Sequence, residues 1–172
     1  MSPAIRPFKA AVLQYTARGT QQDTLPIVEA LIGAAASTGA DIVCLPECAN
    51  FLAANKTALK EQVEDEANSP TLDLLSALAK KHRIIVSAGS LMMANTASAE
   101  TDTRVANRSF LINEHGAIIA RYDKIHMFDA DVGDGKSYRE SVHFRPGQQM
   151  VDIQTSSCLL YTSDAADDTP CV

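Results

Sequence analysis

The stretch Asp41-Ile42-Val43-Cys44-Leu45-Pro46-Glu47 is apolar from its second to its fifth residue and ends on a carboxylate. A short, continuously apolar run of this kind predicts a strand that is buried on both faces, as in a parallel sheet. Residues 8–13 form an earlier short apolar run with the length of a strand. The chain between the two runs must then cross over the sheet.

The crossover segment predicts a helix. Asp23 or Thr24 is the expected N-cap, Pro26 suits the first turn, and Gly39 is a typical stop. Apolar residues recur between these signals at helical spacing. They are Val28, Leu31, Ile32 and Ala35. The result is a βαβ unit, whose crossover is expected to be right-handed.

The following segments extend this α/β pattern. Ser69-Pro70 opens a second helix that leads into a buried strand at 84–87, and residues 105–112 and 117–122 flank a hairpin turn. The remaining segments predict irregular structure. They are a short helix and solvated loop at 50–68, an exposed loop at 92–103, and irregular chain from 123 to 135.

Composition excludes several classes of function. The net charge of -6 and the absence of a long Lys/Arg run argue against nucleic-acid binding. No apolar run approaches the roughly 20 residues that span a membrane, and no apolar segment follows Arg6, so secretion is not signalled and a cytoplasmic protein is expected. The four cysteines fit no metal spacing, the aspartates at 129, 131 and 134 lack the rest of a calcium loop, and no glycine-rich phosphate loop occurs. We therefore expect neither a metal nor a cofactor.

Three charged residues follow predicted strands or lie in the loops beyond them. Glu47 comes directly after the strand at 42–45, and Lys124 comes directly after the strand at 117–122. Functional sites of open α/β sheets gather at such strand ends. A glutamate there suits a general base, and a lysine can stabilise a developing oxyanion. Glu140 lies in a later loop, and each of the three taken alone is more simply a surface residue.

Together with their neighbours, these residues resemble a known family. The strings are L-P-E at 45–47, R-Y-D-K-I-H-M-F-D at 121–129, and Y-R-E-S at 138–141 before F-R-P-G at 144–147. Their order and spacing resemble the nitrilase superfamily of carbon–nitrogen hydrolases. The likeness is greatest to the bacterial amidase branch that includes omega-amidase and deaminated glutathione amidase, and it runs from about Phe8 to about Thr155.

The resemblance implies a four-layer α-β-β-α sandwich, of which this chain supplies roughly the first half, and a homo-oligomer. It also implies that a cysteine thiolate attacks a small amide or nitrile, with release of ammonia from an amide and without a cofactor. Residue by residue, Glu47 matches the base and Lys124 matches the lysine that stabilises the oxyanion. Glu140 matches a second glutamate near the substrate amide.

The expected nucleophile, in a C-Y-D-x-R-F-P string, is absent from this sequence. Cys158 lies near the right region, but its neighbours do not match. Cys48 is expected to point away from Glu47, since adjacent strand residues alternate, and Cys44 is expected to be buried. We therefore expect no turnover from this chain. The alternatives are a small-amide-binding protein without catalysis and a short hydrolase that uses Cys158.

The character of the sequence changes at Cys158. The stretch C-L-L-Y-T-S-D-A-A-D-D has no period that continues the domain, and it resembles the translation of an adapter used in DNA library preparation. We therefore divide the chain into a hydrolase part at 7–157 and a non-native tail at 158–172. With half a sandwich, the strand faces should lack part of their cover. The residues expected to be uncovered are Val105, Phe110, Leu111 and Ile112.

Overall fold

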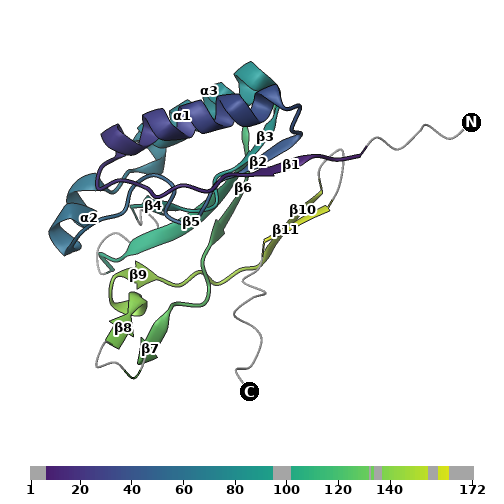
Figure 1. The fold of residues 1–172 in the computed structure, drawn as a ribbon. Coiled ribbons are helices and arrows are strands. Elements are labelled where there is room, and N and C mark those ends of the chain that lie inside the picture. The colour runs from purple at the N-terminus through teal and green to yellow at the C-terminus, as the bar shows by residue number, and fades with distance from the viewer. Residues whose placement is uncertain (1–6, 95–101, 132, 134–136, 155–158, 163–172) are drawn as a thin grey trace, which may run out of the picture.

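A computed structural model of the chain describes residues 7–94, 102–131, 133, 137–154 and 159–162. It is an α/β structure in which two long helices lie along one face of a mixed sheet (Figure 1). The helices are α1 (Gln21–Ser37), α2 (Lys56–Gln62) and α3 (Pro70–His82), with 3₁₀ turns η1 (Glu66–Asn68) and η3 (Glu140–Val142). The predicted α/β class is confirmed.

The main sheet contains seven strands within the described residues. They are β1 (Ala10–Val12), β2 (Ile42–Cys44), β3 (Ile85–Ser87), β4 (Leu91–Met93), β5 (Val105–Ile112), β6 (Ile118–Asp123) and β9 (Phe144–Arg145). Two hairpins lie beside it. They are β7 (Asp129–Asp131) with β8 (Ser137–Arg139), and β10 (Val151–Gln154) with β11 (Leu159–Thr162).

The long strand β5 organises the sheet. Strands β1, β2 and β3 run parallel, and β3 and β4 pair antiparallel with one edge of β5. The opposite edge pairs with β6 and β9. Ser87 pairs with Leu111 and Leu91 pairs with Arg108, so three residues on the β3–β4 side face two on β5. The sheet therefore carries a bulge of one extra residue at positions 88–90.

Helix α1 begins earlier than the sequence predicts. Thr20 is the N-cap, and its Oγ1 accepts a hydrogen bond from the Asp23 backbone N–H at 3.2 Å. Thr20 Oγ1 also donates to the Asp23 carboxylate at 2.7 Å. The prediction of Asp23 or Thr24 as the cap is wrong, and Pro26 lies inside the helix rather than in its first turn. The helix stop at Gly39 is confirmed by its φ of 77° directly after the C-cap Thr38.

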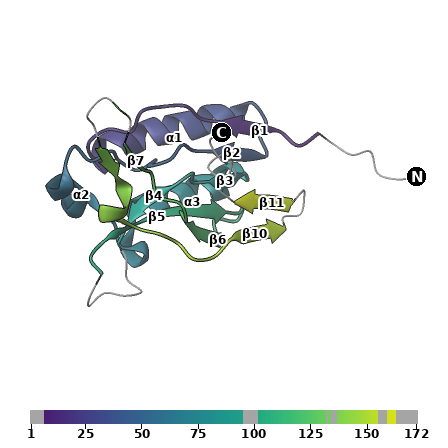
Figure 2. The ribbon, with the colours of Figure 1, turned by 90° about the horizontal axis from the view of Figure 1, so that it is seen from below.

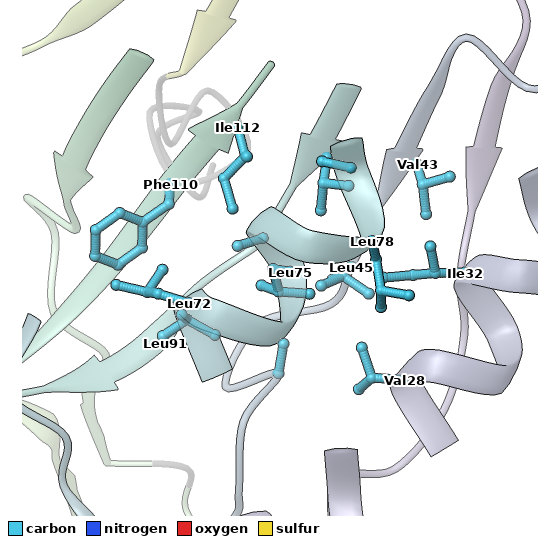
Figure 3. Close-up of a cluster of buried hydrophobic side chains, with 14 of the residues drawn as sticks. Val28, Ile32, Val43, Leu45, Leu72, Leu75, Leu78, Leu91, Phe110 and Ile112 are labelled. Carbon is cyan, nitrogen blue, oxygen red and sulfur yellow. The ribbon is translucent and has the colours of Figure 1, made fainter. Parts of the chain in front are cut away.

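The main core lies between the helices and the sheet (Figure 3). Val28 and Ile32 of α1 and Leu72, Leu75 and Leu78 of α3 pack on side chains from the sheet. The labelled partners are Val43, Leu45, Leu91, Phe110 and Ile112. Each fully buried aliphatic side chain of this kind contributes about 1.5–3 kcal/mol relative to leaving it exposed. This core holds the sheet at the end of β2, where the chain continues to Glu47.

The other face of the sheet is also partly covered. Ile42, Ile85 and Leu111 are buried there, and Ile153 of β10 packs against them. Figure 2 shows the β10–β11 hairpin beside β6. The expectation that Val105, Phe110, Leu111 and Ile112 lack cover is wrong. All four are buried.

Three predictions of irregular structure hold only in part. The loop expected at 92–103 starts later than predicted, because Met92 and Met93 belong to the buried strand β4, and its residues 95–101 lie outside the described residues. The segment after residue 122 contains β7. The short helix expected within 50–68 is confirmed as α2, whereas Glu64 of the expected solvated loop is buried. In the expected tail, Leu159–Thr162 pair with β10 as strand β11. Among the described residues, no helix is long and apolar enough to cross a membrane.

Candidate active site

Glu47 lies in the loop after β2, which is fastened to the bulge between β3 and β4. Gly89 in the bulge has a φ of 60°, and a Cβ at this position would lie 2.1 Å from the Pro46 carbonyl oxygen. Ser90 holds the next part of the loop. Its Oγ accepts from the Cys48 N–H at 3.0 Å, and its carbonyl accepts from the Ala49 N–H at 2.8 Å. The bulge therefore sets where the chain carries Glu47.

Lys124 follows β6 and is held by its main chain on both sides. Its N–H donates to the Asn107 carbonyl of β5 at 2.9 Å, and its own carbonyl accepts from the Gly147 N–H at 2.7 Å. The preceding residue, Asp123, receives both arms of the Arg108 guanidinium at 2.6 and 3.0 Å. Paired hydrogen bonds of this kind restrict orientation as well as distance. The base of the Lys124 side chain is thus fixed in the sheet.

Glu140 opens the turn η3 after β8. Its Oε2 accepts from the Phe128 N–H at 2.6 Å, and its own N–H donates to the Phe128 carbonyl at 3.2 Å. This two-way contact ties the end of the β7–β8 hairpin to its beginning. Glu140 is therefore held from the strand side while its carboxylate remains directed at Lys124.

The three predicted site residues meet in space. Lys124 Nζ lies 3.1 Å from Glu47 Oε1 and 3.0 Å from Glu140 Oε2. The side chains of Lys124 and Glu140 are 17% and 16% exposed, whereas that of Glu47 is 57% exposed. One ammonium therefore bridges a sheltered carboxylate and an open one.

The electrostatics favour a charged lysine. Burial lowers the pKa of Lys124, but hydrogen bonds and charge attraction from Glu140 and Glu47 outweigh it and leave that pKa above its usual value. Lys124 is thus protonated throughout the neutral range. A fixed ammonium in a partly desolvated place can stabilise an adjacent negative charge without reorganising.

Asn107 belongs to the same cluster and was missed from the sequence. It is 3% exposed, and its Nδ2 donates to Glu47 Oε1 at 2.8 Å. The available signal was the amide of Asn107, the first of three consecutive polar residues within the strand at 105–112. Its partner lies 60 residues away along the chain, so the pairing could not be predicted from local pattern.

A cavity of about 1170 Å³ opens beside the cluster. Its wall includes the β7–β8 hairpin, where the ring centroids of Phe128 and Tyr138 lie 5.6 Å apart and the two rings are tilted. Glu47, Lys124 and Glu140 all line this cavity. Cavities with a few convergent polar groups and an aromatic wall are typical of small-molecule sites.

Cys48 also lines this cavity, contrary to the expectation that it points away from Glu47. Its φ of 53° departs from extended geometry, so the alternation of strand side chains does not apply. Burial, and then the charges of Glu47 and Glu140, raise the pKa of the Cys48 thiol to about 12 although Lys124 lowers it. Cys44 is only half-buried, contrary to expectation, and burial raises the pKa of its thiol. Neither thiol is ionised near neutral pH, and Cys158 lies outside the described residues.

The described part of the chain contains no group of three or more His, Cys, Asp or Glu residues that could hold a metal ion. Of the three aspartates considered above, Asp129 accepts from the Ser141 N–H and hydroxyl, and Asp131 pairs with Arg139. Asp134 lies outside the described residues.

Residues 9–160 match the family model of the carbon–nitrogen hydrolases. The chain belongs to this family of enzymes, which confirms the resemblance seen in its motifs. The match includes three residues of the tail expected to be non-native.

Among individual proteins, the chain is similar in sequence to two amidases. The chain is 34% identical over 152 residues to the deaminated glutathione amidase of Synechocystis, a match that covers 88% of this chain and 54% of that protein. It is 33% identical over 116 residues to omega-amidase NIT3 of Saccharomyces cerevisiae, covering 66% of this chain and 38% of the relative. The chain spans about half the length of the curated relatives it matches.

Solved structures agree on the fold. The NitFhit protein of C. elegans superposes with a TM-score of 0.71 at 26% identity, over 83% of this chain and 34% of that one. Saccharomyces cerevisiae Nit3, described as a member of branch 10 of the nitrilase superfamily, superposes with a TM-score of 0.72 at 23% identity, over 88% of this chain and 53% of the other. The fold is that of the nitrilase superfamily, so the predicted partial α-β-β-α sandwich is confirmed.

Proposed function

We propose that this chain carries the acid–base and oxyanion-stabilising part of a hydrolase that releases ammonia from small amides. The single observation that carries the proposal is the position of Lys124 Nζ within 3.1 Å of both Glu47 and Glu140 beside an open cavity. The names of the two relatives, deaminated glutathione amidase and omega-amidase, support the same substrate class.

Each residue has a distinct role in the proposed reaction. Glu47 accepts the proton of a cysteine thiol as its sulfur bonds to the amide carbon, and then passes that proton to the amide nitrogen as the C–N bond breaks. Lys124 pairs with the carbonyl oxygen, which becomes negative only in the tetrahedral intermediate. Water then hydrolyses the thioester, again with Glu47 as the base. Glu140 keeps Lys124 charged and aimed at the cavity.

We place the nucleophile of this proposal outside the described cysteines, because neither Cys44 nor Cys48 lies in the C-Y-D-x-R-F-P string that the family resemblance implies. A Cys48 thiol with a pKa of about 12 is almost wholly protonated at neutral pH. We therefore propose that the 172-residue chain alone binds amides and does not hydrolyse them. For an enzyme as long as the curated relatives, association into homo-oligomers is expected from the family resemblance.

The experiment measures ammonia release from butyramide and from monoamides of dicarboxylic acids. We expect none from the 172-residue chain, and release from a fusion in which residues 7–154 precede the C-terminal half of the Synechocystis amidase. Glu47→Gln in the fusion should abolish release, and exposed Glu61→Gln on α2 is the matched control.

Two results would favour the alternatives. Ammonia release by the chain alone that disappears in Cys158→Ala would show a short hydrolase that uses this cysteine. Amide binding by the chain, combined with an inactive but folded fusion, would favour a binding protein without catalysis.

A further inference from the structure

We infer that Asn107 is a positioning residue that turns the Glu47 carboxylate so that Oε2 is the oxygen that exchanges the proton. This inference rests on the proposed role of Glu47 as the base. It concerns a residue that the motifs did not single out, and it assigns different tasks to the two carboxylate oxygens.

Two donors converge on one oxygen of Glu47. Asn107 Nδ2 lies 2.8 Å and Lys124 Nζ lies 3.1 Å from Oε1. Oε2 accepts no hydrogen bond from any side chain or backbone group in the described part of the chain, and the Glu47 side chain is 57% exposed at the cavity wall. With Oε1 occupied by two donors, Oε2 retains the lone pairs that a proton can reach.

A comparison with a second buried asparagine separates a structural from a positioning role. Asn50 is 0% exposed and bonds the Met92 backbone in both directions, at 3.4 Å to its carbonyl and 3.1 Å from its N–H. That arrangement joins a loop to β4. The Asn107 side chain is as deeply buried, but within the described residues its amide bonds only to Glu47. A buried polar group is costly unless it is paired, and here the partner is the proposed base.

The backbone of Asn107 makes the arrangement rigid. Its carbonyl accepts from the Lys124 N–H at 2.9 Å, while its side chain donates to Glu47. One residue on β5 therefore sets the separation between the base and the lysine. Because an amide does not titrate, Asn107 holds Oε1 without competing for the proton that Glu47 carries.

The test uses the side-chain amide of Asn107 in the ¹⁵N-labelled 172-residue chain. Its two N–H signals should be widely separated, because one N–H is bonded to the Glu47 carboxylate. Glu47→Gln replaces that carboxylate with a neutral amide and should narrow the separation, and because Glu47 is exposed the variant should fold. Glu140→Gln removes the other carboxylate of the cluster and should leave the separation unchanged. The side-chain signals of Asn50 should stay the same in both variants.

Asn107 signals that are unaltered in Glu47→Gln would overturn the inference. The measurement requires no turnover, so it can succeed or fail independently of the ammonia-release experiment. Signals that follow Glu47 in a chain whose fusion is inactive would leave the Asn107–Glu47 bond established and the amidase proposal wrong.

Discussion

Lys124 Nζ and Glu47 Oε1 lie 3.1 Å apart although 77 residues separate them in the sequence. The contact depends on two backbone features of the sheet. The loop that carries Glu47 packs closely against the bulge at Gly89. The Lys124 backbone N–H donates a hydrogen bond to the Asn107 carbonyl. Because both features involve β5 or its direct neighbours, the charged cluster is a property of the sheet and does not rely on a flexible loop alone.

Removing the ammonium should cripple hydrolysis by the active fusion. We expect Lys124→Ala to lower the rate of ammonia release by about 10²–10³, the usual loss for one oxyanion-stabilising group. Lys80→Ala on α3 is a matched control that removes a lysine far from the cavity. A rate within about threefold of the parent in Lys124→Ala would show that this lysine is not the oxyanion partner.

The thiol of Cys48 should resist alkylation at neutral pH. A pKa of about 12 leaves roughly one thiol in 10⁴ ionised at pH 8, and reactivity should rise as the pH approaches 12. Removing a charge that raises the pKa should increase labelling, so Glu47→Gln should react faster than the parent at pH 9. Lys124→Met removes a charge that lowers the pKa and should react more slowly. Peptide mass spectrometry after iodoacetamide treatment measures both, and equal rates in the three proteins would contradict the assigned causes.

Gly89 and Gly33 should respond to alanine in opposite ways. At Gly89 the positive φ and the 2.1 Å approach of the Pro46 oxygen leave no place for a Cβ. We expect Gly89→Ala to lower the free energy of unfolding by at least about 1–3 kcal/mol. Gly33 lies within α1, and a Cβ at this position would have no other atom within 4 Å. Gly33→Ala should therefore raise the free energy of unfolding by about 0.5–1 kcal/mol. Urea unfolding measures both changes, and a stable Gly89→Ala would mean that the loop can leave the bulge.

Glu64 should stabilise the start of α3. Glu64 is 5% exposed, and its carboxylate accepts from the hydroxyls of Ser69 and Thr71 and from the Thr71 N–H at 3.2 Å. Glu64→Ala leaves these donors without their acceptor, so we expect a loss of about 1–3 kcal/mol. Exposed Glu61→Ala is the control and should change stability by less than about 0.5 kcal/mol. Equal unfolding midpoints for the two variants would refute the capping role.

The sequence predicted the elements whose local signals agree. The run at 42–45, the helix opened by Ser69-Pro70 and the hairpin around residues 113–116 all occur as expected. Thr20 was overlooked although it stands three residues before Asp23, a spacing typical of helix caps. The start of the loop expected at 92–103 was placed too early, because pairing with β5 decides where the strand Leu91–Met93 ends. The bond between Asn107 and Glu47 is likewise a product of the folded sheet.

The bulge at 88–90 between β3 and β4 also restricts how the length of this chain can vary. Side chains of Leu91 and Met93 enter the helix-side core, whereas Met92 joins a separate cluster with Phe51. Adding or deleting one residue at 88–90 would slide β4 by one position and exchange these faces. We therefore expect relatives to differ in the length of their surface loops but to keep the length of the segment at 88–90. A regular strand without the bulge would pair more residues with β5, so pairing alone does not explain this segment. The bulge thus makes the number of residues between β3 and β4 a condition for forming both apolar clusters.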